Sequence, residues 1–364
     1  MAPPWMWAWK LAIGITEFGH WFALAALGML VLGLFCLRSG WRIVGVLLSI
    51  WALIGFLHPA VIAWHRGARL PTELQVALGG SAPTEPALSV IHLFVPRKVS
   101  AATMTTEVYS HAGGESLRLD FYRPASGGPT APCVVVVHGG GWDAGDRTQL
   151  PELNHRLASL GYAVASIDYR LMPTWRWPAP REDLRTAIAW LKANATRLGI
   201  DRDNLVLLGR SAGAQIVQVV GFSGDDPSIR GVISFYGPSD LDFGYRHTVE
   251  NDTIRSRSLL RAYLGGTPDD VPAAYREASG INYVTARTPP TLLLHGRLDT
   301  LAWYRHDERL EAKLRDAGVP HFYLELPWAT HGFDFNPDGP GGQLADTAVR
   351  YFLTVVTRSP RQSR

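Results

Sequence analysis

The residues with the clearest chemical meaning in this chain are Gly209–Gly213, which read Gly-Arg-Ser-Ala-Gly. They follow the apolar run Leu205–Leu208 and precede Ala214–Phe222, a run compatible with a helix. A strand, a Gly-x-Ser-x-Gly turn and a helix in this order are typical of a nucleophile elbow, where glycines let the backbone turn sharply. We expect the elbow to hold Ser211 beside a helix N-terminus, which favours developing negative charge. The pattern predicts nucleophilic attack by a serine.

A serine hydroxyl is a weak nucleophile until a base accepts its proton. His331 is the candidate base, in a loop after the strand-like run His321–Leu326. Asp299, after the predicted strand Thr291–Leu294, is the candidate acid that orients the imidazole and stabilises its charged form. Two other interpretations stay open, with His331 as a surface-loop histidine and Asp299 as a helix N-cap. Asp240, after the preceding strand, is the rival acid.

A glycine-rich loop, His138–Trp142, follows the valine-rich run Cys133–Val137. The run is apolar on both faces, as in a buried parallel strand. Acyl transfer needs N–H donors aimed at the oxyanion of the tetrahedral intermediate. We assign that role to the backbone N–H groups of Gly140, Gly141 and Ala212. The alternatives are a flexible loop or a phosphate cradle, but the Gly-Lys-Ser/Thr of a Walker P-loop is absent.

From about Thr103 to about Thr357 the chain resembles the hormone-sensitive-lipase-like carboxylesterases of the α/β-hydrolase superfamily, within the group whose first motif reads His-Gly-Gly-Gly-Trp. These proteins share the chain order serine, acid, histidine. The resemblance implies ester chemistry with Ser211 as nucleophile, His331 as base and Asp299 as acid. It implies neither a metal nor a cofactor. The matching residues are His138–Trp142, Asp168–Leu171, Pro178–Pro180, Glu182-Asp183, Gly209–Gly213, Asp299 and His331–Phe333.

Two residues within these motifs are candidate substrate contacts, Trp142 and Arg210. The resembling proteins usually carry an acidic residue at the position of Arg210, so this chain changes the charge beside the serine. One interpretation is that Arg210 binds an anionic acyl group. The alternative is a salt-bridged or solvent-facing arginine.

The alternation of apolar runs and helical patterns predicts an α/β-hydrolase fold, a mostly parallel eight-stranded sheet with helices on both faces. The run Ser116–Tyr122 alternates, as expected for an antiparallel edge strand. The stretch Leu241–Tyr283 interrupts the alternation, and we expect it to form part of a lid over the acyl site, the alternative being a plain surface excursion. The predicted strands are Thr106–Ser110, Ser116–Tyr122, Cys133–Val137, Ala163–Asp168, Leu205–Leu208, Gly231–Phe235, Thr291–Leu294 and Phe322–Leu326.

The amino-terminal fifth predicts a two-helix transmembrane hairpin. The apolar runs Trp21–Leu37 and Ile43–Trp64 flank the short polar turn Arg38–Arg42, and a membrane span needs about 20 residues. Tryptophans near the ends of the runs fit interfacial aromatic belts. The alternatives are a cleaved signal peptide, which the second run disfavours, and a buried globular hairpin.

Glu17 and His20 lie just before or inside the first run. An ionisable group deep in a membrane would suggest a functional site, but we expect both at the membrane surface, with Trp5–Gly19 partly along it. The basic residues on the two sides of the hairpin are nearly balanced and slightly favour a cytoplasmic catalytic domain. Cys36, in a span, and Cys133, in a core strand, show no disulfide pattern.

The chain divides into a hairpin at residues 1–66, a connecting segment at 67–103, a catalytic domain at 104–358 and a polar tail at 359–364. Its 364 residues are 47% hydrophobic and 18% charged, which suits one large core plus two spans. A net charge of +3 without a clustered basic tract argues against a nucleic-acid partner. The expected partners are a small-molecule or lipid ester and the lipid bilayer, and the oligomeric state stays unknown.

The combined prediction is a membrane-anchored serine hydrolase that cleaves carboxylic esters through an acyl-enzyme. The same residues would also suit a peptidase, a lactonase or a deacylase of a lipid or glycan. A third interpretation is a non-enzymatic binding or scaffold protein, which the complete Ser–Asp–His set opposes.

Overall fold

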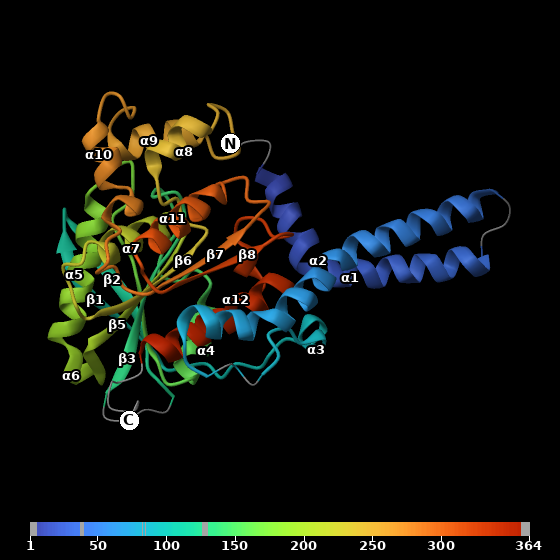
Figure 1. The fold of residues 1–364 in the computed structure, drawn as a ribbon, viewed down its shortest axis with the longest axis horizontal. Coiled ribbons are helices and arrows are strands. Elements are labelled where there is room, and N and C mark those ends of the chain that lie inside the picture. Colours follow the sequence, from blue (N-terminus) through green and yellow to red (C-terminus); the bar gives the residue numbers. More distant parts are fainter. Residues whose placement is uncertain (1–5, 37–39, 82, 84, 126–129, 358–364) are drawn as a thin grey trace.

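The computed structural model describes residues 6–36, 40–81, 83, 85–125 and 130–357. Its centre is an eight-stranded sheet in the order β1-β2-β4-β3-β5-β6-β7-β8 (Figure 1). β2 pairs antiparallel with β1 and β4, and the other neighbouring strands are parallel. The strands are β1 (Met104–Ala112), β2 (Glu115–Tyr122), β3 (Ala131–Val137), β4 (Ala163–Ile167), β5 (Ile200–Arg210), β6 (Ile229–Phe235), β7 (Thr291–Gly296) and β8 (His321–Leu326).

All eight predicted strands are present, so the predicted α/β-hydrolase sheet is confirmed. The run Ser116–Tyr122 lies in β2 and pairs antiparallel as expected. Its expected edge position is wrong, because β1 covers its outer side. An alternating pattern reports that one face of a strand is more exposed than the other, and an inner strand beside a peripheral one shows the same pattern.

Helices cover both faces of the sheet, and β3 shows how the strand side chains divide between them. Val135 and Val137 belong to one core cluster, together with residues of α5, α7 and α11. Val134 and Val136 belong to the other, with residues of α4 and α12. A strand buried on both faces reads as a continuous apolar run. These helices are α4 (Pro151–Ser159), α5 (Ala179–Ala193), α7 (Ala212–Phe222), α11 (Arg305–Asp316) and α12 (Pro340–Val356), and the short α6 (Ala195–Leu198) follows α5.

Helix α2 (Gly40–Leu78) continues well past residue 66, the predicted end of the hairpin. Its inner part packs on α12, where Leu70 is fully buried in the same cluster as Leu344. A Cβ added to Gly67 would lie 3.1 Å from the Leu344 side chain. The predicted boundary at residue 66 is therefore wrong, because one helix runs from the hairpin into the core of the catalytic domain. The predicted tail at 359–364 lies outside the described residues.

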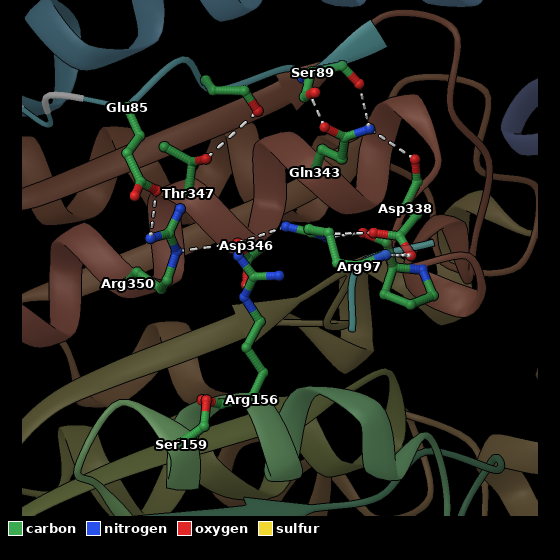
Figure 2. A network of polar contacts seen from close by, with 12 residues as sticks. Glu85, Ser89, Arg97, Arg156, Ser159, Asp338, Gln343, Asp346, Thr347 and Arg350 are labelled. Atoms are coloured by element: carbon green, nitrogen blue, oxygen red, sulfur yellow. Dashed lines mark hydrogen bonds and ion pairs between the residues drawn. The ribbon is translucent and has the colours of Figure 1, made fainter. Parts of the chain in front are cut away.

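The segment between α2 and β1, which includes α3 (Val90–Phe94), is fastened to the catalytic domain by a polar network (Figure 2). Gln343 of α12 bonds the backbone N–H and C=O of Ser89. Asp346, also on α12, is shared by three arginines. They are Arg97 of the segment at 3.2 Å, Arg156 of α4 at 2.6 Å and Arg350 of α12 at 3.0 Å.

The outer parts of α1 (Met6–Cys36) and α2 project away from the sheet and its helices (Figure 1). Both helices are long and apolar enough to cross a membrane, judged by length and composition. Large apolar side chains stand exposed on them, such as Phe35 and Trp51. The two helices approach closely at Gly19, where an added Cβ would lie 2.6 Å from the carbonyl oxygen of Phe56.

The first part of α1 lies against the catalytic domain. The carboxyl group of Glu17 is fully buried and accepts the Gly341 N–H at 2.8 Å. His20 is also buried, with its ring edge-on to Phe94 of α3. The expectation that Glu17 and His20 lie at the membrane surface, with Trp5–Gly19 partly along it, stays a prediction. Protein covers both side chains, because α1 docks on the domain before it projects.

Candidate active site

The nucleophile elbow expected from the sequence is present. β5 ends at Arg210 and α7 begins at Ala212, so Ser211 forms the turn between them. Its backbone has a φ of 53° and a ψ of −117°, a conformation that residues with side chains rarely adopt. A side chain at Gly213 would clash with the carbonyl oxygen of Val137 on β3, so a glycine is needed for α7 to approach the sheet.

Three side chains from three loops meet at the carboxyl edge of the sheet. The Nε2 atom of His331 lies 3.0 Å from the hydroxyl oxygen of Ser211, and its Nδ1 lies 2.6 Å from the Oδ2 of Asp299. When Nδ1 carries the proton, it donates to Asp299 and Nε2 can accept the serine proton. The rival acid Asp240 lies elsewhere, because it caps the following helix and pairs with Arg309 at 2.9 Å.

Asp299 is also held from its far side. Its Oδ1 accepts the backbone N–H groups of Leu301 and Ala302 at 2.8 and 2.9 Å. The interpretation of Asp299 as a helix N-cap is wrong, because α11 begins only at Arg305 and its N-cap is Tyr304. Its Oδ2 lies 3.1 Å from the Nε2 of His295, whose Nδ1 lies 2.8 Å from Asp307. Sequence reasoning missed His295, although it stands four residues before the acid at the end of the same strand.

This chain of buried groups fixes the charges behind the serine. Burial would raise the pKa of Asp299, but the imidazoles of His331 and His295 outweigh it and hold the pKa well below its usual range. Burial would lower the pKa of His295, but the carboxylates of Asp307 and Asp299 raise it to about 10. At neutral pH His295 is therefore a cation, and Asp299 stays ionised. An ionised acid is the form that stabilises an imidazolium.

The residues assigned to the oxyanion hole lie together in the wall of the cavity that contains Ser211. Gly140 has a φ of 120°, and a side chain there would clash with the carbonyl oxygen of Ala144, so this turn requires glycine. Among residues 6–36, 40–81, 83, 85–125 and 130–357, the N–H groups of Gly140, Gly141 and Ala212 donate to no protein acceptor. Three free donors beside a serine can hold the oxyanion of an acyl-transfer intermediate.

Comparison with known proteins agrees with this geometry. The family model described as BD-FAE matches residues 119–314, more than half of the chain. The chain belongs to the BD-FAE family. The matched part includes Ser211 and Asp299 and ends before His331, so the histidine is placed by its contacts with the other two side chains.

Curated relatives of this BD-FAE chain include two proteins of Mycobacterium tuberculosis. Esterase LipC is 35% identical over 246 residues, which are 64% of this chain and 60% of LipC. The chain thus spans less than two thirds of that relative. The probable carboxylic ester hydrolase LipM is 27% identical over 395 residues, which are 96% of this chain and 87% of LipM.

Solved structures show the same fold. A truncated carbohydrate esterase from gut microbiota has a TM-score of 0.61 at 21% identity, over 72% of this chain and 100% of that one. An esterase from Thermogutta terrifontis has a TM-score of 0.58 at 21% identity, over 72% of this chain and 95% of that one. The catalytic part of this BD-FAE protein is therefore an α/β-hydrolase domain with an additional amino-terminal hairpin.

The cavity in front of Ser211 has a volume of about 730 Å³. In this BD-FAE chain, the segment expected to form a lid folds into α8 (Leu241–His247), α9 (Ser256–Leu264) and α10 (Pro272–Glu277). Side chains of α8 and α9, including Leu259, line the cavity. This segment therefore shapes the space around the serine, as predicted.

The two candidate substrate contacts of this BD-FAE protein line the cavity, but protein partners occupy their polar atoms. The indole N–H of Trp142 donates to Gln215 at 2.9 Å, and its ring stacks on Tyr263. Arg210 is buried and pairs with Asp334 at 2.6 Å, so the salt-bridge interpretation holds and the proposed free cation for an anionic acyl group does not. Within the described part of the chain, no three His, Cys, Asp or Glu side chains are grouped to hold a metal ion.

Two further residues that line the cavity were not predicted from the sequence. Met6 and Trp9 of α1 line the cavity beside the lid residues. They lie more than 100 residues before the first motif of the BD-FAE domain in the chain. No local pattern links such a distant helix to the site, because its docking depends on the assembled surface of the domain.

Proposed function

We propose that this protein is a serine hydrolase that cleaves carboxylic esters through an acyl-enzyme. The observation that carries the proposal is the continuous hydrogen-bonded chain from Ser211 through His331 to Asp299, at 3.0 and 2.6 Å. The elbow, the free N–H donors and the similarity to esterases support it. The relatives named as esterases favour esters over the amide and lactone alternatives.

The reaction follows from the positions of these groups. The hydroxyl oxygen of Ser211 attacks the ester carbonyl while the Nε2 of His331 accepts its proton. The carbonyl oxygen becomes an oxyanion, which accepts the N–H groups of Gly140, Gly141 and Ala212. Collapse of this intermediate breaks the bond to the leaving alkoxide, which takes the proton from His331 and departs as the alcohol. Water then gives a proton to the same imidazole and attacks the acyl-enzyme. When this second intermediate collapses, the Ser211 oxygen takes the proton from His331 and the carboxylic acid leaves.

Labelling with a fluorophosphonate tests the activated serine. We expect the full-length protein in detergent to be labelled at Ser211, and Ser211→Ala to lose both the label and ester turnover. Loss of the nucleophile of a triad costs up to about 10⁶-fold in kcat. Ser223→Ala, at the end of α7, is the matched control and should stay active. Folded protein that takes up no label would contradict the proposal and favour the scaffold interpretation, and faster turnover of amides or lactones would change the substrate class.

We also propose that the outer parts of α1 and α2 anchor the enzyme in a bilayer, with the catalytic domain on the cytoplasmic side. The exposed apolar side chains and the length of both helices support anchoring. The protein should stay in membranes during carbonate extraction. In a Cys36→Ser background, Ser39→Cys should react with an impermeant maleimide in intact cells. Release by carbonate would contradict the anchor, and a protected Ser39→Cys would reverse the orientation.

A further inference from the structure

Helix α1 reaches the catalytic cavity before it projects from the domain. Met6 and Trp9 line the cavity that contains Ser211. The indole N–H of Trp9 donates to the backbone oxygen of His331 at 2.9 Å, and the centroids of the two rings lie 6.5 Å apart. The indole thus stands beside the proposed catalytic base, as part of the cavity wall.

A first group of contacts joins α1 to the segment that carries this histidine. A Cβ added to Gly332, next to His331, would lie at van der Waals distance, 3.5 Å, from both Trp9 and Ile13, so α1 lies close to this loop. Glu17, two turns further along α1, accepts the indole N–H of Trp328 at 3.3 Å. The wall is therefore held in place at both ends of the docked segment.

A second group of contacts holds α1 at Glu17. The side-chain carboxyl group of Glu17 accepts the backbone N–H of Gly341, and the backbone oxygen of Glu17 accepts the side-chain N–H of Asn336 at 2.8 Å. Asn336 precedes α12, and Gly341 lies in its first turn. A buried carboxyl group is costly unless it is hydrogen-bonded, so these bonds fix the position of the helix on the domain.

The same helix then continues into the apolar hairpin. Twelve residues separate Trp9 from Trp21, which is about 18 Å along a helix at about 1.5 Å per residue. Figure 1 shows the start of α1, in dark blue, descending along the right side of the domain before the hairpin projects outward. The anchor and the cavity wall are therefore parts of one continuous element.

We propose that Met6 and Trp9 are specificity-determining residues, which bind the apolar part of the ester against α1. The rest of the apolar lining comes from the lid and neighbouring loops, including Leu259, Trp303 and Phe335. An indole and a thioether offer apolar surface, and the one polar atom of the indole is already bonded to His331. The proposal rests on the proposed ester hydrolysis and assigns it a substrate class, esters with an extended apolar group.

The test is a chain-length profile of 4-nitrophenyl esters, from acetate to dodecanoate, with full-length protein in detergent. We expect Trp9→Ala to change the ratio of kcat/KM for long and short esters at least fivefold, mainly through KM. Trp9→Phe keeps an aromatic wall and should stay within about twofold of wild type. Trp7→Ala is the matched control, since Trp7 lies on the same helix, is 64% exposed and does not line the cavity.

Met6→Trp supplies the opposite change, and it adds bulk at the partly exposed first turn of α1. It should shift the profile toward short esters, whereas Trp9→Ala enlarges the cavity and should shift the profile toward long esters. The proposal would be overturned if each variant changed kcat/KM by the same factor for every ester, because a purely structural role would lower activity without changing the chain-length profile. Absent labelling and turnover in wild type would instead contradict the proposed function.

Discussion

Two regions of this molecule approach His331, and they are built in different ways. At the edge of the sheet, backbone geometry fixes the groups: the positive φ of Ser211, the left-handed turn at Gly140 and the loop of Asp299 leave little freedom. On the other side, α1 is seated by side chains, through the indole of Trp9 and the buried carboxyl group of Glu17. The rigid region suits chemistry, and the side-chain-packed region suits substrate selection.

The difference predicts where substitutions act. Changes at the sheet edge should remove catalysis for every substrate, because they displace reacting atoms. Changes in α1 should alter which esters fit and how firmly the helix is docked, while the reacting atoms keep their places. The following experiments compare the two regions, from the largest expected effect to the smallest.

Asp299→Asn tests the rigid region most directly. Replacing the acid of a serine triad by its amide lowers kcat by about 10⁴-fold, because the imidazole is then held in the wrong tautomer. We expect a loss of that size in kcat for 4-nitrophenyl esters, with the chain-length profile unchanged. Asp240→Asn, which lies outside the triad, should change kcat by less than about threefold, since the exposed pair it makes with Arg309 is weak. A comparable loss in both variants would contradict the assignment of the acid.

His295→Asn tests the support behind the acid. A hydrogen bond to a charged group is worth about 1.5–3 kcal/mol, so we expect kcat/KM to fall roughly 10- to 150-fold. His111→Asn, on the peripheral strand β1, should leave kcat/KM unchanged. An unchanged kcat/KM in folded His295→Asn would contradict a role of His295 in supporting the acid.

The pKa of His295 also predicts a pH dependence of stability. Its pKa is raised from about 6.5 in the unfolded chain to about 10 in the fold. The stability contributed by the protonated form is therefore complete below pH 6.5 and is lost as the pH rises toward 10. Melting temperatures of wild type should fall over this window more steeply than those of His295→Asn. Parallel curves would contradict a charged His295.

The rigid region could be predicted from the sequence because its constraints are local. The elbow needs glycines at fixed spacing, and the strands Cys133–Val137 and Leu205–Leu208 are apolar on both faces. The position of β2 within the sheet could not be predicted, because alternation describes one strand and pairing involves two. The continuation of α2 to Leu78 could not be predicted, because the apolar run that indicates a span ends at Trp64 and charged residues such as Arg66 and Arg69 follow it, while the helix itself continues.

The docked region could not be predicted for a different reason. An apolar helix that packs on a protein and one that crosses a membrane have the same composition, so the start of α1 resembled the start of a span. One signal was available in Glu17, a carboxyl group in an otherwise apolar stretch. Such a group needs hydrogen-bond partners, and in this fold they come from Trp328, Asn336 and Gly341, more than 300 residues away.

Glu17→Leu tests the hydrogen bonds that dock α1 on the catalytic domain. It leaves the N–H groups of Gly341 and Trp328 buried without an acceptor, which costs about 1–3 kcal/mol each. We expect a lower free energy of unfolding in detergent and faster proteolysis before Trp21, with kcat for short esters within about threefold of wild type. Glu73→Gln, which removes a partly exposed ion pair on α2, is the control. Unchanged proteolysis would contradict the docking of α1.

Gly19→Ala and Gly14→Ala form a matched pair on the same helix and carry the smallest expected effect. Alanine favours a helix by about 1 kcal/mol over glycine, so both substitutions stabilise helix α1 by the same amount. At Gly14 nothing lies within 4 Å of an added Cβ, whereas at Gly19 the carbonyl oxygen of Phe56 lies at 2.6 Å, and that oxygen belongs to backbone. Gly14→Ala should raise the melting temperature slightly, and Gly19→Ala should lower it by forcing α1 and α2 apart. The hairpin joins the catalytic domain through the docked part of α1. A lower melting temperature of Gly19→Ala with an unchanged ester profile would show that the packing of α1 on α2 can change without changing the cavity wall, and equal shifts in both variants would contradict the close approach at Gly19.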